Sequence, residues 1–195
     1  MKECKCVFSI FGATGDLTKR KLLPAFYFLE QERQLKDNFS IVCIARKEKS
    51  ADDYKKEAAE AIKKFSRIKV TDEVLNKLIS RISYRQLEFS DKIGYENLKE
   101  YVKSISGEKS AHCERIFYLA VPYSLIGTIV HNLKSVGLAE RHKENRPYCR
   151  LMFEKPFGYD LKSAKKLNTA IISVFDEKQI YRIDHYMAKE LVQNL

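Results

Sequence analysis

The stretch CKCVFSIFGATGDLTKRK, residues 4–21, decides the fold of this chain. Its first eight residues form a β-rich run that Gly12 stops, and a segment that favours helix follows from Asp16 to about Lys36. Gly12 and Gly15 let backbone N–H groups approach a pyrophosphate at the positive end of that helix. The spacing G-x-x-G-D-L differs from the commoner G-x-G-x-x-G, so a turn that simply needs two glycines stays open as an alternative.

Strand candidates and amphipathic helical segments alternate along the rest of the chain. The run FSIVCIAR, residues 39–46, is apolar on both alternations, as strands buried on both faces of a parallel sheet are. Five or six strands that alternate with helices predict a doubly wound, mostly parallel sheet with helices on both faces. The further strand candidates are 82–89, 115–122, 148–153 and 179–183; the helical segments are 51–65, 71–79 with Thr71 as its N-cap, 95–105, 126–136 and 161–171.

Length and composition indicate a folded protein of one domain, or of one domain and the start of another. The chain has 195 residues, of which 45% are hydrophobic, with 11 Phe and 11 Tyr to fill a core. No run approaches the roughly 18 apolar residues of a membrane span, and Gly12 interrupts the N-terminal run before it could act as a signal peptide. We therefore expect no membrane association and a cytoplasmic location.

The basic balance of the chain favours an anionic partner. Lys and Arg number 36 against 26 Asp and Glu, which suits either nucleic acid or small phosphorylated molecules. Segments such as DDYKKEAAEAIKKF, residues 52–65, interleave acids with the lysines, and no basic stripe studded with aromatic residues occurs. This pattern argues against nucleic acid as the partner.

The five cysteines are expected to be small core residues. Cys6, Cys43 and Cys149 lie in apolar runs that read as strands. Cys4 and Cys6 form a C-x-C pair without a second ligand pair, which is weak support for a metal site.

Arg46 stands where folds of this kind select their cofactor. At the end of the second strand an acidic residue would accept the ribose 2′-hydroxyl of NAD, and an arginine would accommodate the 2′-phosphate of NADP. Lys47 follows Arg46, and no acid occurs before Glu48, so the sequence predicts a preference for NADP. The alternative is that Arg46 is only an exposed residue at a strand end.

Two further motifs give the chain a family resemblance. These are EKPFG, residues 154–158, and RIDHYMAKE, residues 182–190. With the glycine turn and Arg46, in this order, the whole chain resembles the glucose-6-phosphate dehydrogenase family. The resemblance implies oxidation of glucose 6-phosphate at C1 with NADP, which gives the phosphogluconolactone and NADPH in the oxidative pentose phosphate pathway.

The resemblance also assigns cofactor residues. The arginine at Arg46 would hold the 2′-phosphate. Lys155 looks like the family lysine that lies between nicotinamide and sugar, so it would serve cofactor, substrate and catalysis, and Pro156 after it is often a cis-proline in the family. The positions that would line the cofactor at the glycine turn are Gly12, Thr14, Gly15, Asp16 and Leu17.

The closing motif resembles the family's substrate site. His185, Tyr186 and Lys189 would bind the phosphate of glucose 6-phosphate, and Asp184 would orient a separate catalytic histidine. Imidazole, phenol and ammonium donors suit a phosphate dianion, and on a helix His185 and Lys189 would share one face.

The catalytic base itself is not found in the sequence. His112, His131 and His142 lack a suitable context, and in the family the base belongs to a C-terminal domain. We therefore expect residues 1–181 to form the NADP-binding domain and residues 182–195 to begin the substrate-binding domain.

This division implies that the chain is inactive alone and forms a homo-oligomer only with the C-terminal domain. The alternative is a stand-alone NADP-binding module that senses the cofactor or pairs with a separate C-terminal half.

Overall fold

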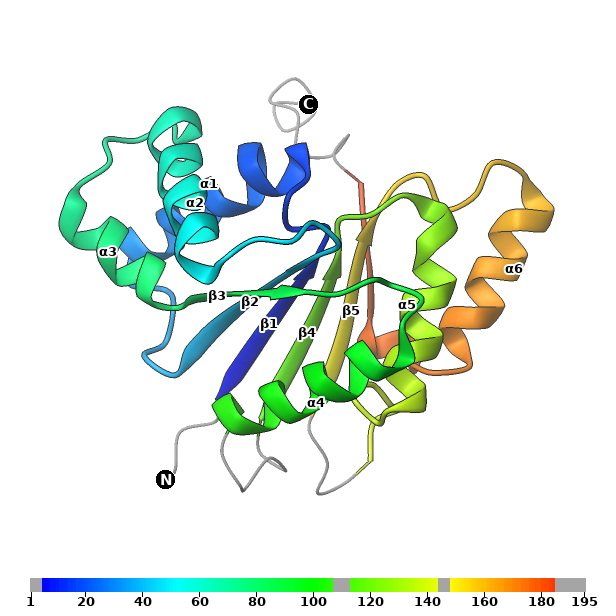
Figure 1. Cartoon of the computed structure of the whole chain (residues 1–195). Coiled ribbons are helices and arrows are strands. Elements are labelled where there is room, and N and C mark those ends of the chain that lie inside the picture. Colours follow the sequence, from blue (N-terminus) through cyan, green and yellow to red (C-terminus); the bar gives the residue numbers. More distant parts are fainter. Residues whose placement is uncertain (1–4, 107–112, 144–147, 185–195) are drawn as a thin grey trace.

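One parallel sheet organises the molecule. The computed structural model describes residues 5–106, 113–143 and 148–184, and within them six strands pair in the order β3-β2-β1-β4-β5-β6 (Figure 1). The order reverses between β1 and β4, so the predicted doubly wound α/β fold is confirmed. The strands are β1 Cys6–Phe11, β2 Phe39–Ala45, β3 Ile82–Gln86, β4 Glu114–Leu119, β5 Cys149–Glu154 and β6 Ile180–Ile183.

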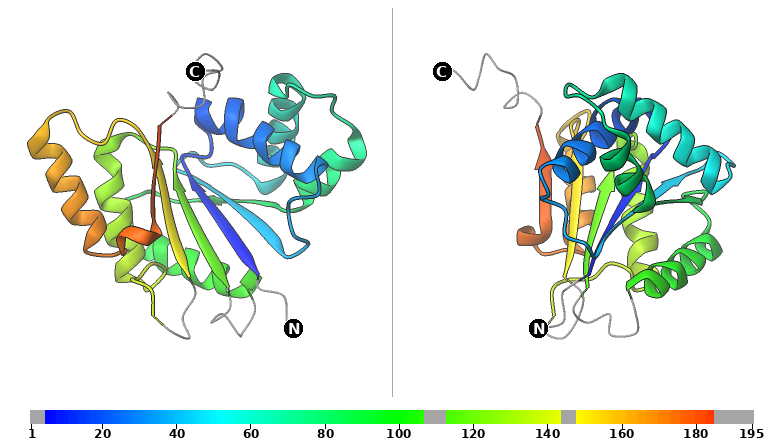
Figure 2. Two further views of the ribbon diagram at one scale, coloured as in Figure 1. Left: turned by 180° about the vertical axis from the view of Figure 1, so that it is seen from behind. Right: turned by 90° about the vertical axis from the view of Figure 1, so that its left-hand side faces the viewer.

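Helices cover both faces of this sheet, as Figures 1 and 2 show. The helices α1, α2 and α3 pack on one face through a core that includes Tyr27, Tyr54 and Leu78. The helices α4, α5 and α6 pack on the other face through residues such as Tyr95 and Ile129. The helical elements are η1 Thr18–Leu22, α1 Leu23–Gln31, α2 Ala51–Phe65, α3 Asp72–Ser80, α4 Lys92–Ser106, α5 Tyr123–Ser135, α6 Leu161–Ile172 and η3 Glu177–Gln179.

The first helical segment is shorter than predicted. It begins at Asp16, widens into the π-helical η1, and ends at Gln31 instead of about Lys36. Arg33 has a φ of 55°, which an α-helix cannot accommodate, and the chain reverses there towards β2. Arginine rarely adopts this conformation, so its presence at position 33 does not predict a turn.

The third strand ends earlier than its sequence pattern predicts. The third strand was expected over residues 82–89, but β3 ends at Gln86, and a turn follows in which the Asp91 N–H donates to the Glu88 carbonyl at 2.9 Å.

At the other end of the sheet, the predicted domain division between residues 181 and 182 falls inside β6 and stays a prediction.

The cysteines behave largely as expected. Cys43 and Cys149 are buried, as predicted, and Cys6 is half-buried. Among the described residues, no group of three or more His, Cys, Asp or Glu side chains could hold a metal ion, and Cys4 lies outside them. No helix in the described part of the chain is long and apolar enough to cross a membrane.

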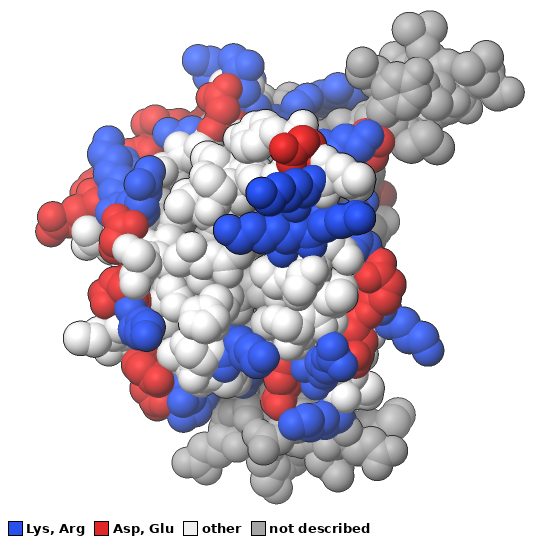
Figure 3. Space-filling view, turned by 90° about the vertical axis from the view of Figure 1, so that its right-hand side faces the viewer, with Lys and Arg blue, Asp and Glu red and all other residues white. Residues whose placement is uncertain are grey.

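Charges of both signs share the surface. Figure 3 shows the right-hand side of Figure 1, where acidic side chains lie between basic ones around a largely uncharged middle. This face therefore carries no continuous basic stripe of the kind that follows a nucleic-acid backbone.

Candidate functional site

The glycine turn after β1 lies in close contact with the backbone at the end of β4. Gly12 has a φ of 91°, and a Cβ atom at this position would lie 2.1 Å from the carbonyl oxygen of Ala120. The N–H groups of Gly12 and Ala13 both donate to the Ile44 carbonyl, at 2.9 and 3.0 Å. Only glycine fits this position, because a side chain would meet backbone atoms in a left-handed conformation.

Hydrogen bonds lead the turn directly into the helix. The Gly15 N–H donates to the Gly12 carbonyl at 2.9 Å, and the Thr18 hydroxyl donates to the same oxygen at 3.2 Å. Asp16 and Leu17 are the first helical residues, so the positive end of the helix opens at the turn.

From α2, the buried Tyr54 hydroxyl donates to the Ala13 carbonyl at 2.9 Å. Burial raises the pKa of this phenol, so the hydroxyl stays a hydrogen-bond donor well into alkaline pH. The turn is therefore fixed from both β4 and α2.

A cleft of about 460 Å³ opens at the carboxyl ends of β1, β2 and β4. It brings together Gly12, Thr14, Gly15 and Arg46, as the sequence predicted, whereas Asp16 and Leu17 do not line it. The other lining residues are Ala45, Lys47, Glu88, Phe89, Ala120, Val121, Pro122 and Leu125.

Several of these cleft residues were not assigned from the sequence. Phe89 follows β3, and Val121 and Pro122 follow β4, so they supply apolar walls. They could have been predicted from their place directly after a strand, because the carboxyl ends of parallel strands meet at one edge of the sheet.

A second hollow of about 440 Å³ adjoins the cleft and shares Thr14 and Lys47 with it. Two of its lysines form ion pairs with Glu57 on α2: Lys49 and, at 3.4 Å, Lys19. The hydrogen bond from Lys49 is the main cause that lowers the pKa of the Glu57 carboxyl. An array of basic groups thus lies at the end of β2 beside Arg46 and Lys47.

Lys155 and Asp184 meet at the opposite side of the same sheet edge. They follow β5 and β6, in which Glu154 pairs with Ile183, and the Lys155 ammonium lies 2.6 Å from the Asp184 carboxylate. The Lys155–Pro156 peptide is cis, which confirms the expectation for Pro156. Lys155 does not line the cleft at the glycine turn.

The remaining predicted substrate residues, His185, Tyr186 and Lys189, lie outside the described residues, as does His112. His131 lines a hollow between α5 and α6, and His142 packs against Tyr148. Neither of these two histidines lines the cleft.

The arrangement can bind a dinucleotide. It offers a glycine turn at a helix start for a pyrophosphate, and cations for a further phosphate at the end of β2. The apolar walls suit the flat rings of such a ligand.

Comparison with known proteins agrees with this geometry. The model of the family described as "Glucose-6-phosphate dehydrogenase, NAD binding domain" matches residues 9–194. Among curated relatives, the glucose-6-phosphate 1-dehydrogenase of Chlamydia muridarum is 41% identical over 192 residues, which are 97% of this chain and 38% of the relative. That of Leuconostoc mesenteroides is 37% identical over 195 residues, which are 100% of this chain and 39% of the relative. The chain thus spans about two fifths of the length of these relatives.

Solved structures give the same assignment. A glucose-6-phosphate dehydrogenase in complex with its substrate glucose-6-phosphate matches with a TM-score of 0.84 and 33% identity, over 98% of this chain and 39% of that one. A glucose-6-phosphate 1-dehydrogenase from Mycobacterium avium matches with a TM-score of 0.81 and 31% identity, over 99% of this chain and 41% of that one. On its sequence and on its fold, this chain belongs to the glucose-6-phosphate dehydrogenase family, as a member that matches the family's nicotinamide-dinucleotide-binding domain.

Proposed function

We propose that this chain is the NADP-binding part of a glucose-6-phosphate dehydrogenase, which oxidises glucose 6-phosphate at C1 to the phosphogluconolactone. The observation that carries the proposal is the shared edge: the glycine turn, Arg46 and the Lys155–Asp184 pair all lie where the parallel strands of one sheet end. Ligands of open α/β sheets bind at this edge.

The preference for NADP over NAD rests on the end of β2. Arg46 and Lys47 are exposed and both line the cleft beside the glycine turn. Glu88, an acid that also lines it, accepts a hydrogen bond from the Phe89 N–H at 3.0 Å. Two cations at this point suit a 2′-phosphate better than a neutral 2′-hydroxyl.

We infer the roles of Lys155 and Asp184 from the family resemblance, and the contact between the two side chains supports them. When bound, the nicotinamide accepts the hydride from C1, so a base must take the proton of the C1 hydroxyl. Lys155 would place its ammonium near the sugar, and Asp184, which balances that charge, would orient the base. We assign the sugar phosphate to His185, Tyr186 and Lys189.

From the family resemblance, we propose that the base is a histidine of a C-terminal domain. The described His131 and His142 lie elsewhere, in the hollow between α5 and α6 and against Tyr148. We therefore expect no glucose-6-phosphate-dependent reduction of NADP by the 195-residue chain. A cytoplasmic location, and a homo-oligomer formed through a C-terminal domain, are parts of the same proposal.

Calorimetric titration with NADP and NAD tests the cofactor assignment. Arg46→Ala should weaken NADP binding about 10- to 100-fold, since a charge-assisted hydrogen bond contributes about 1.5–3 kcal/mol, and should leave NAD binding within about twofold. Arg67→Ala, which removes an exposed arginine that does not line the cleft, is the matched control. Equal affinities of the unaltered chain for NADP and NAD would contradict the proposal.

A further inference from the structure

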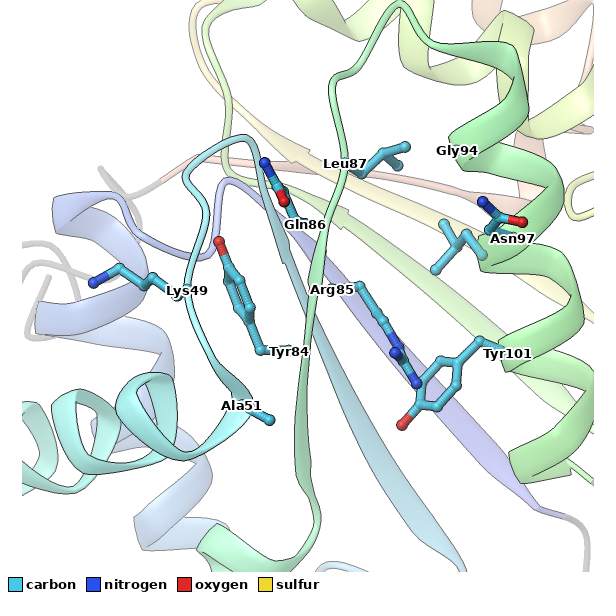
Figure 4. Close-up of a pocket in the computed structure, with 10 residues that line it drawn as sticks. Lys49, Ala51, Tyr84, Arg85, Gln86, Leu87, Gly94, Asn97 and Tyr101 are labelled. Atoms are coloured by element: carbon cyan, nitrogen blue, oxygen red, sulfur yellow. The ribbon is translucent and has the colours of Figure 1, made fainter.

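A hollow of about 550 Å³ lies at the open edge of β3, away from the cofactor cleft (Figure 4). None of its lining residues lines the cleft at the glycine turn. Its volume falls within the roughly 300–1,000 Å³ typical of ligand sites. The lining residues are Lys49, Ala51, Tyr84, Arg85, Gln86, Leu87, Gly94, Asn97, Leu98 and Tyr101.

The strand that crosses this hollow has one unpaired edge. Within the part of the chain that the structure describes, β3 is the last strand of the sheet on its side and pairs with β2 alone. The Arg81 carbonyl accepts a hydrogen bond from the Ile41 N–H, and the Leu87 N–H donates to the Ala45 carbonyl, both at 2.9 Å. The backbone groups of Arg81 and Leu87 therefore face β2. Because successive residues of a strand point alternately to its two edges, the backbone groups of Tyr84 and Gln86 face outwards. Tyr84 and Gln86 both line the hollow.

Arg85 is a cation held in place beside this edge. Its guanidinium carbon lies 3.5 Å from the centroid of the Tyr101 ring on α4, as Figure 4 shows for the two side chains. Stacking fixes the plane of the guanidinium and leaves its N–H groups directed outwards. No carboxylate of the described residues forms an ion pair with Arg85, and the side chain is exposed.

The hollow has an excess of positive charge. None of its lining residues is Asp or Glu. The charge of Lys49 is matched by its ion pair with Glu57, so the guanidinium of Arg85 is the charge that lacks a counterpart. Asn97 adds an amide on the α4 side, and Ala51 and the buried Tyr84 line the α2 side.

We propose that this hollow is a docking site for an extended acidic peptide segment, which adds as a strand beside β3. The outward backbone groups of Tyr84 and Gln86 would pair with the main chain of the segment. A carboxylate on the α4 side of the segment would accept a bidentate pair of hydrogen bonds from Arg85. Apolar side chains on the opposite side of the segment would pack on Ala51 and Tyr84.

Two features favour this occupant over a second copy of the chain. Pairing of two β3 edges would bring the Arg85 cations of both copies together, and each copy carries a net charge of +10. An extended segment with carboxylates is instead attracted to the Arg85 guanidinium. Its main chain can also pair with the open edge of β3, whereas a small anion would leave that edge unpaired.

Calorimetric titration of the 195-residue chain with a capped hexapeptide of alternating valine and glutamate tests the site. We expect saturable binding, and protection of the Tyr84 and Gln86 amides from hydrogen exchange in the complex. Arg85→Glu should reduce the affinity at least about tenfold, with an unchanged circular dichroism spectrum.

Two controls separate edge pairing from general charge attraction. Lys165→Glu makes the same charge change at an exposed position on α6 and should leave the affinity unchanged. The same peptide with N-methylated valines keeps its carboxylates but cannot pair with a strand, and it should bind at least about tenfold more weakly.

Several outcomes would overturn the proposal: no binding of the hexapeptide, equal loss in both glutamate variants, equal binding of the N-methylated peptide, or an equal response to inorganic phosphate. Dimerisation of the unaltered chain with protection of Tyr84 and Gln86 would assign the edge to a second copy instead.

Discussion

At the scale of single residues, Gly12 shows most directly how the sequence determines the site. Its left-handed backbone and its approach to Ala120 let two N–H groups share one carbonyl of β2, so the turn, β2 and β4 are locked together. The residue therefore holds the fold together and also shapes the turn that we propose for the pyrophosphate.

Gly12→Ala should destabilise the chain by about 2–4 kcal/mol, because it combines a strained φ with a backbone clash. Urea denaturation measures the free energy of unfolding. Gly127→Ala is the matched control: Gly127 lies inside α5 with nothing within 4 Å of an added Cβ, so it should gain about 0.5–1 kcal/mol. Similar stability of both variants would disprove the role given to Gly12.

The residues found from the sequence are those with a local signal. The glycine turn and Arg46 could be predicted, because each stands at a fixed offset from a strand. The grouping of Lys19 and Lys49 around Glu57 could not, since charged side chains from three segments meet only in the folded chain.

At the scale of secondary structure elements, the position of a helix N-cap was easier to predict than its capping hydrogen bond. Thr71 stands at the N-cap of α3, as expected, yet its side chain makes no capping hydrogen bond. Ser50 caps α2 with its hydroxyl oxygen, which accepts from the Asp53 N–H at 3.0 Å. A residue type at the right position thus predicts a cap, but the rotamer decides whether the bond forms.

Ser50→Ala should therefore cost about 1 kcal/mol of unfolding free energy, and Thr71→Ala less than half of that. Thermal and urea denaturation of the two variants measure the difference. An equal cost for both substitutions would show that the capping bond of Ser50 contributes nothing.

At the scale of the whole molecule, burial of polar groups in both cores predicts a response to alkaline pH. Burial raises the pKa of the Cys43 thiol to about 12 and that of the Cys149 thiol to about 11, from an ordinary value of 9.0. It also raises the pKa values of the Tyr54 and Tyr118 phenols. These groups ionise in the unfolded chain before they ionise in the folded one.

The stability that these raised pKa values contribute is complete below pH 9 and is lost as the pH rises towards the folded values. Each thiol should lower the free energy of unfolding by up to about 1.4 kcal/mol per pH unit above pH 9. Urea denaturation between pH 8 and pH 10.5 should show this slope, and the variant with Cys43→Ala and Cys149→Ala should show a shallower one. The same slope in both proteins would mean that the thiols do not contribute.

The overall architecture was the most predictable level, because alternating strand and helix patterns allow few arrangements. The order of the strands in the sheet depends on packing between residues far apart in the sequence. The exact ends of single elements were not predictable either, because the hydrophobic pattern continues past the ends of α1 and β3. The contact between Lys155 and Asp184 likewise needed the pairing of β5 with β6.

The central place of β1 also determines how the chain can fold during synthesis. β1 leaves the ribosome before the other described strands, yet Cys6 pairs with Glu114 of β4, so one of its two edges stays open until β4 has been made. Pairings over such long separations make folding slow and expose strand edges meanwhile. The glycine turn, which joins β1 to β2 and β4, is therefore complete only after β4 has emerged, and nascent chains shorter than this should not yet hold the cofactor.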